Sequence, residues 1–142
     1  MAGDGGRIVV GVDGSDAAHA ALRWALSEAR LTGAVLEAVI AWEYPVFDLG
    51  EVLLPPHDPE SMATQMLQHA VEREQTDGVE VRQRVVAGHA AQVLVEAARG
   101  ARLLVVGSRG RGTFTAAMLG SVAYHSVQHA PCPIVVVRGT EQ

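Results

Sequence analysis

Short apolar runs alternate with segments of helical spacing along the whole chain of 142 residues. The runs cover residues 8–12, 34–42, 79–87, 103–106 and 132–137. Between them, apolar residues recur every three to four positions, which is the spacing of an amphipathic helix. Strands that alternate with helices in this way form a parallel sheet, and right-handed crossovers place helices on both faces. The alternation therefore predicts an α/β fold with a doubly wound sheet of five parallel strands.

Two of the runs indicate the order of the strands. Run 8–12 is the most apolar for its length, which is typical of a central strand. Run 79–87 begins by alternating apolar with charged residues, as a half-exposed edge strand does. These features favour the order 3-2-1-4-5. The helices are expected from an N-cap at Ser15 or Asp16 up to Gly33, at 60–75, at 90–98, and from an N-cap at Ser121 to residue 130.

The chain is expected to form one domain over residues 7–142, preceded by a flexible tail at 1–6, where three glycines occur without an apolar anchor. Its net charge of -5 argues against nucleic-acid and membrane-surface partners, because both need a basic face. No apolar run approaches the roughly 18–20 residues of a membrane span, and the first residues lack an apolar signal core. We therefore expect a cytoplasmic protein.

A loop rich in glycine and arginine follows the apolar run 103–106. It contains Gly107, Gly110 and Gly112 together with Arg109 and Arg111. At the carboxyl end of a parallel strand, glycines let the backbone approach phosphate oxygens and point several amides at them. The same glycines also fit a plain turn, so the pattern leaves both interpretations open.

Two further polar residues are expected beside this loop. Ser121 stands at a predicted helix start, where a hydroxyl and unpaired amides favour an anion. Asp13 ends the first apolar run, and the predicted strand order brings the carboxyl ends of strands one and four into one crevice. Its carboxylate suits a ribose hydroxyl or the amine of a base, and a helix cap is the alternative.

The absence of lysine excludes several nucleotide-binding classes. All eleven basic residues are arginine. A Walker-type phosphate loop needs its lysine on the β- and γ-phosphates, and kinase-type folds and two-component receivers also need one.

The spacing Gly107-x2-Gly110-x9-Gly120-Ser121 resembles the nucleotide signature of the universal stress protein family, G-x2-G-x9-G-(S/T). Residues 129–137 are similar to that family's closing helix and strand, and residues 8–15 are similar to its first strand and turn. The resemblance covers about residues 5–139.

This resemblance implies a five-stranded Rossmann-like fold, a homodimer formed through the last strand (Ile134–Val137), and ATP binding. Gly88 would lie near the same crevice. No basic residue occurs in 114–119, so ADP and AMP stay open as the resident nucleotide, with Mg²⁺ as an accompanying ion. Carried over by position, the nucleotide-binding residues would be Gly11, Val12, Asp13, Val39 at the end of the second strand, Gly107, Arg109, Gly110, Gly120, Ser121 and Val122.

Three functions follow from these observations. The first is a dimeric, nucleotide-dependent sensor or regulator in stress response. The second is a slow ATPase or another nucleotide-hydrolysing enzyme, in which Asp13 is the only obvious acid. The third is a dimerisation module without ligand, but the intact glycine spacing argues against this function. We assign no catalytic residue. We also assign no metal site, because His125 and His129 have no third ligand evident nearby. The proline-rich segment 43–59 is expected to be a ligand lid or a partner surface, and Met62, Met66 and Met118 are expected to fill the interface between helix and sheet.

Overall fold

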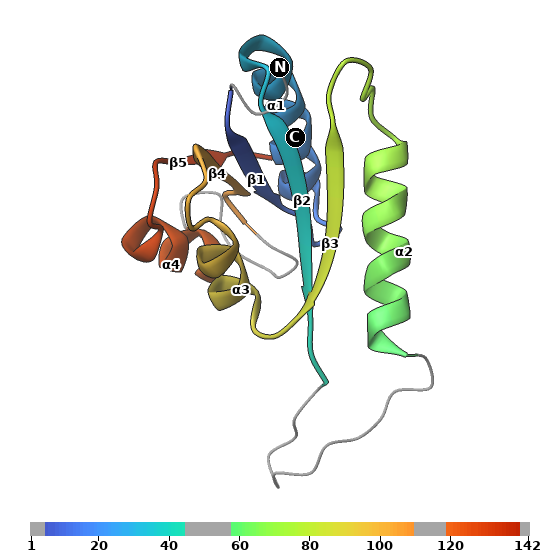
Figure 1. Ribbon diagram of the computed structural model, residues 1–142. Coiled ribbons are helices and arrows are strands. Elements are labelled where there is room, and N and C mark those ends of the chain that lie inside the picture. Colours follow the sequence, from blue (N-terminus) through green and yellow to red (C-terminus); the bar gives the residue numbers. More distant parts are fainter. Residues whose placement is uncertain (1–4, 45–57, 110–118, 140–142) are drawn as a thin grey trace, which may run out of the picture.

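A computed structural model describes residues 5–44, 58–109 and 119–139. Nine elements alternate along these residues, and their five strands form one parallel sheet in the order β3-β2-β1-β4-β5 (Figure 1). This confirms the predicted fold class and strand order. The strands are β1 (Arg7–Gly11), β2 (Val35–Trp42), β3 (Val81–Ala87), β4 (Leu103–Gly107) and β5 (Ile134–Val137). The helices are α1 (Asp16–Thr32), α2 (Pro59–Glu72), α3 (Ala90–Ala97) and α4 (Ser121–His129).

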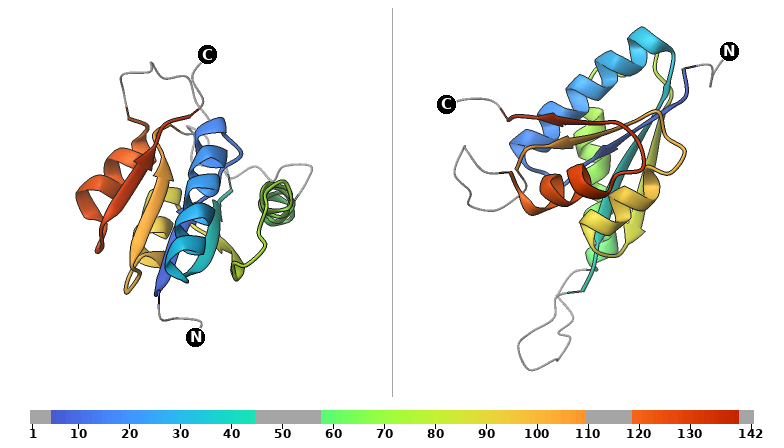
Figure 2. Two further views of the ribbon diagram at one scale, coloured as in Figure 1. Left: turned by 90° about the horizontal axis from the view of Figure 1, so that it is seen from above. Right: turned by 90° about the vertical axis from the view of Figure 1, so that its left-hand side faces the viewer.

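The sheet lies between two helix layers (Figure 2). On β1, Ile8 and Val10 pack into a core cluster with residues of α1 and α2, whereas Val9 belongs to a second cluster with residues of α3 and α4. Successive side chains of a strand point to opposite faces, so both faces of this central strand are buried. No helix in the described part of the chain is long and apolar enough to cross a membrane.

Two helices begin at side-chain caps. The hydroxyl of Ser15 accepts a hydrogen bond from the Ala18 N–H at 3.1 Å, so Ser15, and not Asp16, is the N-cap of α1. Asp58 caps α2 in the same way, and Pro59 takes the first helical position, where its missing N–H costs nothing. The expectation that Pro59 belongs to the preceding loop is therefore wrong by one residue. Residues 45–57 of the predicted loop 43–59 lie outside the described residues.

The last helix and strand differ from the expectation. Gly120, and not Ser121, is the N-cap of α4, and Ser121 is the first helical residue. The final strand begins at Ile134 because residues 131–133, which include two prolines, form a bend before it. The bounds of the first and third strands also differ by one or two residues from the predicted runs 8–12 and 79–87, since apolar side chains continue beyond the hydrogen-bonded ladder.

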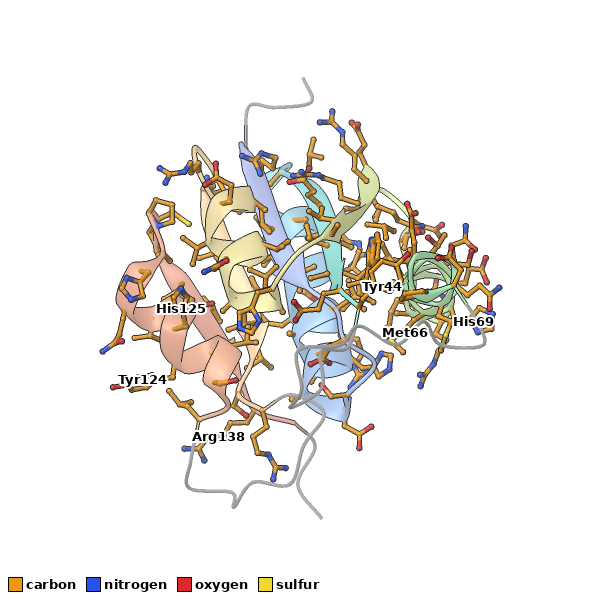
Figure 3. All side chains as sticks on the ribbon, turned by 90° about the horizontal axis from the view of Figure 1, so that it is seen from below. Tyr44, Met66, His69, Tyr124, His125 and Arg138 are labelled. Carbon is orange, nitrogen blue, oxygen red and sulfur yellow. The ribbon has the colours of Figure 1, made fainter. Side chains whose placement is uncertain are left out.

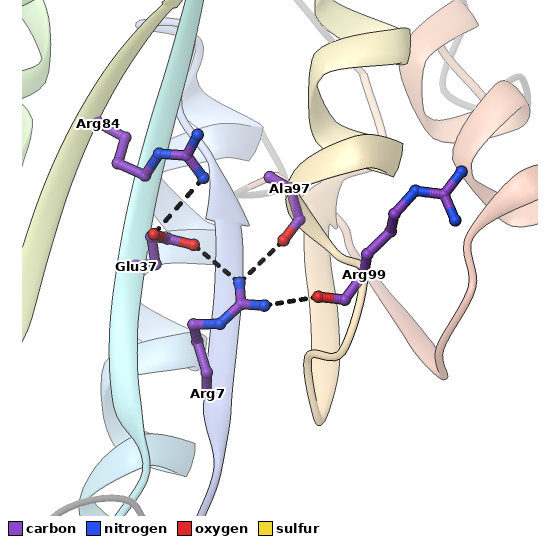
Figure 4. A network of polar contacts seen from close by, with 5 residues as sticks. All are labelled: Arg7, Glu37, Arg84, Ala97 and Arg99. Atoms are coloured by element: carbon purple, nitrogen blue, oxygen red, sulfur yellow. Dashed lines mark hydrogen bonds and ion pairs between the residues drawn. The ribbon is translucent and has the colours of Figure 1, made fainter.

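The guanidinium of Arg7 links the start of β1 to β2 and to the end of α3 (Figure 4). Arg7 donates to the carboxylate of Glu37 at 2.8 Å and to the carbonyl oxygens of Ala97 and Arg99, at the carboxyl end of α3, at 2.8 and 2.7 Å. A second guanidinium, that of Arg84, lies 3.6 Å from the same carboxylate. The guanidinium of Arg7 thereby satisfies a buried charge and helix carbonyls that would otherwise lack donors.

Candidate functional site

A cavity opens at the carboxyl ends of β1 and β4, where the chain connections leave the sheet in opposite directions. This is the position at which open α/β sheets bind ligands. Its empty volume, open solvent included, is about 460 Å³. The lining residues are Gly11, Val12, Asp13, Ala18, Val39, Ala41, Ala90, Leu94, Val106, Gly107, Arg109, Val122 and Ala123.

Seven of the ten residues selected from the sequence line this cavity; Gly120 and Ser121 do not, and Gly110 lies outside the described residues. Val39 lies within β2, paired with Gly11 of β1, and not at the end of the strand as expected. Gly88 was expected near the crevice, but it lines a neighbouring cavity between the sheet and α3, together with Arg7 and Arg84. That cavity has an empty volume of about 960 Å³ and contains the ion pair of Figure 4.

The walls of the crevice are mostly apolar side chains. Val39 and Ala41 contribute one face of β2, Leu94 comes from α3 and Val106 from β4. A Cβ on Gly11 would lie 2.7 Å from Leu94 Cδ1, so a larger residue here would require the Leu94 side chain to shift. Sequence reasoning missed Ala41, Leu94 and Val106; the period-two pattern of β2 was the one signal that places Ala41 on the same face as Val39.

Gly107 allows close packing between β4 and α1, in addition to its place at the start of the glycine-rich loop. A Cβ on Gly107 would lie 2.7 Å from the carbonyl carbon of Ala17 and 2.9 Å from its oxygen. The missing side chain therefore lets α1 approach the end of β4. Helix–sheet packing explains this glycine without a ligand, so Gly107 alone is not evidence for phosphate binding.

Asp13 and Ser15 shape the turn that follows β1. The carboxylate of Asp13 accepts a hydrogen bond from the Ser15 N–H at 2.9 Å through Oδ1, and Gly14 between them has φ of 85°. The Ser15 hydroxyl lies 3.5 Å from the carbonyl oxygen of Arg109, across the crevice. Within the described part of the chain, the other carboxylate oxygen of Asp13 accepts no hydrogen bond, so it is available at the cavity wall.

The backbone of Ala41 points at the cavity. Val35 donates to Gly6 and Leu36 donates to Glu80, so odd-numbered residues of β2 face β1 and even-numbered ones face β3. The ladder between β1 and β2 ends with Gly11 opposite Val39, and the Val12 N–H donates to the Val39 carbonyl.

Ala41 is the next residue of β2 that faces β1, but β1 has ended there. Among the described residues, no hydrogen bond reaches the Ala41 N–H or C=O on that side. One donor and one acceptor therefore stand side by side at the wall of a mostly apolar cavity.

The start of α4 supplies further donors. The Gly120 N–H donates to the Ser108 carbonyl at 2.7 Å, and the Ser108 N–H donates to Val137, so neither amide is free for a ligand. By contrast, α4 begins without a side-chain cap. The amides in its first turn have no partner within the helix, and together with the helix dipole they favour an anion. Val122, in this turn, lines the cavity.

Comparison with known proteins gives a consistent result. The sequence model of the universal stress protein family matches residues 6–138. A universal stress protein of Mycolicibacterium smegmatis is 36% identical over 138 residues, which are 92% of this chain and 45% of the relative. The chain thus spans a little under half the length of this relative, and it covers 47% and 45% of two universal stress proteins of Mycobacterium tuberculosis.

Solved structures share the fold over nearly the whole chain. A universal stress protein in complex with cAMP superposes with a TM-score of 0.72 at 27% identity, covering 95% of this chain and 98% of that one. A protein of the same family from Burkholderia pseudomallei has a TM-score of 0.66 at 31% identity, with coverage of 93% and 95%.

Proposed function

The chain belongs to the universal stress protein family, and we propose that it binds an adenine nucleotide, with ATP as the resident ligand, in the crevice between β1 and β4. The observation that carries the proposal is the backbone N–H and C=O of Ala41, which have no hydrogen-bond partner among the described residues and border a mostly apolar cavity. The solved family member in complex with cAMP supports an adenine base as the ligand.

The base would lie between the apolar side chains of Val39, Leu94 and Val106. Adenine presents an acceptor, N1, beside a donor, the N6 amine, so its edge is complementary to the N–H and C=O of Ala41. Guanine presents the reverse order on the same edge, a donor at N1 and an acceptor at O6. Because unpaired polar groups in a buried site are costly, this arrangement favours adenine over guanine.

The sugar and phosphates would extend from the base toward Asp13 and α4. The free carboxylate oxygen of Asp13 is suited to accept a hydrogen bond from a ribose hydroxyl. The first turn of α4, with Ser121 and Val122, would hold phosphate oxygens, and Gly107, Arg109, Gly110 and Gly120 would complete the loop around them. Mg²⁺ would accompany the phosphates of ATP.

The proposed biological role is that of a dimeric, nucleotide-dependent regulator in stress response. β5 pairs with β4 on one side, and no described strand covers its other edge. All four residues of β5 are only partly buried, and the neighbouring helix α4 exposes Tyr124 and Val127. An uncovered apolar edge strand of this kind is a ready site for pairing with a second copy.

One observation favours a slow ATPase as the second candidate. Asp13 is the one acidic side chain among the described residues that line the cavity, and one of its oxygens is unpaired. A carboxylate beside Mg²⁺ and phosphates is suited to orient a water molecule for attack. This second function uses the same site, so it differs from the first in turnover and not in binding.

The test measures binding and turnover separately. Purified protein is denatured and its supernatant chromatographed for co-purifying nucleotide; then the nucleotide-free protein is titrated with ATP, ADP, AMP, cAMP and GTP by calorimetry. We expect ATP to bind at least tenfold more tightly than GTP. Equal affinity for GTP, or no binding of any nucleotide, would contradict the proposal. Release of ADP from ATP over hours would favour the ATPase.

A matched pair of variants tests the location of the site. Ala90 is half-buried at the start of α3 and lines the cavity, so Ala90→Trp should fill the crevice and abolish binding. Ala20, which is similarly half-buried on α1, lines none of the described cavities, and Ala20→Trp should bind as the parent does. Equal loss in both variants would point to a general effect on folding.

A further inference from the structure

A groove beside α2 combines methionine and histidine side chains. It lies between α2 and the start of α1, and its empty volume is about 870 Å³. Met62, Met66 and His69 line it from α2. These residues are spaced four and three apart, so they lie on one stripe of the helix. Figure 3, which views α2 end-on, labels Met66 and His69 on this helix.

The stripe is not the face by which α2 packs on the sheet. That face consists of Ala63, Leu67, Ala70 and Val71, all of which are buried. Met62 is 52% exposed, which contradicts the expectation that it fills the interface between helix and sheet. Among the described residues, the Met62 side chain therefore borders the groove and is accessible to a ligand there.

Met66 is held at the base of the groove. It packs against the core cluster, and a Cβ on Gly14 would lie 2.9 Å from its sulfur, so the thioether rests directly on the turn after β1. One sulfur is therefore positioned by packing, while the more exposed Met62 and His69 are free to adjust. Methionine side chains have three rotatable bonds, which allows such a pair to converge.

The donor chemistry determines which ion fits. In the described part of the chain, no group of three or more His, Cys, Asp or Glu side chains is arranged to hold a metal ion. The described lining of the groove instead offers two thioethers and two imidazoles, those of His19 and His69, and no carboxylate. Thioethers select soft cations, Cu(I) above all, and are poor ligands for Mg²⁺, Ca²⁺ and Mn²⁺. We propose that Met62, Met66 and His69 form a site for a soft monovalent cation, Cu(I) or Ag(I).

Two neighbours limit the ligand set. Across the groove, His19 accepts a hydrogen bond at Nε2 from Arg73 at 3.3 Å, and its Nδ1 is buried, so His19 is not a ligand. The guanidinium of Arg73 is engaged with His19, and its repulsion of a monovalent ion in an open groove is screened by water.

The test uses Ag(I) as a redox-inert probe, in a Cys132→Ser background because the single thiol would compete for the ion. Methyl NMR of the four methionines follows the titration. We expect one equivalent of Ag(I) to shift the signals of Met62 and Met66 and to leave those of Met1 and Met118 in place. Competition with a chromogenic Cu(I) chelator, without oxygen, then gives the affinity for Cu(I).

Variants assign the ligands. Met62→Leu, at an exposed position, keeps the helix and should weaken Cu(I) binding at least tenfold, and Met62→Leu with Met66→Leu should abolish it. Gln65→Leu, in the same groove, removes no ligand and should bind as the parent does. Unchanged affinity in the double variant, shifts confined to Met1 or Met118, or displacement of Cu(I) by an equal concentration of Zn²⁺ would overturn the proposal. The site does not depend on nucleotide binding, so the two proposals can fail separately.

Discussion

Gly107 of β4 and Ala17 of α1 approach so closely that a Cβ on the glycine would lie 2.7 Å from the alanine's carbonyl carbon. This contact joins the strand that ends at the crevice to the helix that begins beside it. The close approach includes backbone atoms of Ala17, so it cannot be relieved by turning a side chain.

The first prediction follows from this contact. Gly107→Ala should destabilise the protein by about 1–3 kcal/mol, because the added methyl group must push α1 away from the sheet. Chemical denaturation measures the change. Adding Ala17→Gly to this variant should not restore stability, since the carbonyl carbon and oxygen of Ala17 remain in the way. Full rescue would show that only the two side chains collide.

The second prediction concerns the buried pair Arg7 and Glu37. Glu37 is 8% exposed, and its partner also holds the carboxyl end of α3. Arg7→Met leaves Glu37 with the longer, 3.6 Å contact to Arg84, and Glu37→Gln removes the negative charge beside the Arg7 guanidinium. Each substitution should therefore destabilise the protein, by about 1–3 kcal/mol after allowance for the partial exposure of Arg7. A double-mutant cycle measured by denaturation should give a coupling of about 1 kcal/mol or more. Strictly additive effects would contradict a direct interaction.

The third prediction separates the two roles of Asp13. Asp13→Asn keeps an oxygen that can accept from the Ser15 N–H, so the turn should survive and the melting temperature should change little. The amide carries no charge and is a weaker acceptor for a ribose hydroxyl, so ATP affinity should fall about 5–20-fold, which corresponds to about 1–2 kcal/mol. Calorimetry and thermal melting on the same sample distinguish this outcome from a loss of folding.

The fourth prediction concerns Cys132. Burial raises the pKa of its thiol, with partial compensation by Arg7 and by a backbone hydrogen bond involving Leu104. The unfolded chain therefore loses its thiol proton at a lower pH than the folded chain. The contribution of this thiol to stability is complete below the unfolded-state pKa and is lost as pH rises toward the folded-state value.

Two measurements check this sign. The rate of alkylation of Cys132 should reach its plateau at a higher pH than that of a free cysteine peptide under the same conditions. In denaturation experiments in the alkaline range, the free energy of unfolding of Cys132→Ser should fall less with rising pH than that of the parent. Faster alkylation than that of the free peptide would indicate an exposed, activated thiolate instead.

The fold could be predicted from periodicity because each apolar run has a distinct pattern. The continuous run 8–12 belongs to a strand buried on both faces, and the mixed run 79–87 belongs to an edge. The ends were less certain, since burial extends beyond hydrogen bonding. Val12 is buried, yet it lies past the end of β1 and only its N–H reaches Val39. A hydrophobic pattern indicates which residues are buried, but it does not indicate which residues form backbone hydrogen bonds with a neighbouring strand.

From residue type alone, the candidate site was predictable only where the residue is distinctive, whereas Val12, Val39 and Val122 were selected through the resemblance to the family. Asp13 and Gly107 could be selected because a carboxylate or a glycine at a strand end has few common roles. Ala41 has no such signal: its contribution comes from two backbone groups, and their direction depends on the register of β1 and β2. For Met62 the sequence pattern was misleading. Its helical spacing predicted a buried side chain, but a different stripe of α2 packs on the sheet and Met62 is exposed.

The fifth prediction uses the backbone direction of β5. The Leu104 N–H donates to the Pro133 carbonyl and the Ser108 N–H donates to the Val137 carbonyl, so odd-numbered residues of this strand face β4. Val136 therefore directs its N–H away from the sheet, toward the edge at which we propose that a second copy pairs. Proline has no N–H and is tolerated at the free edge of a sheet.

Val136→Pro should consequently remove an intermolecular hydrogen bond while it keeps the ladder with β4. Light scattering at micromolar concentration should give about twice the chain mass of 15.0 kDa for the parent and a value near one chain mass for the variant. Circular dichroism should show the same helix and strand content in both, with a loss of stability of about 1 kcal/mol, the typical cost of a single substitution. A parent that is already monomeric, or a variant that stays dimeric, would show that the copies do not pair through this edge.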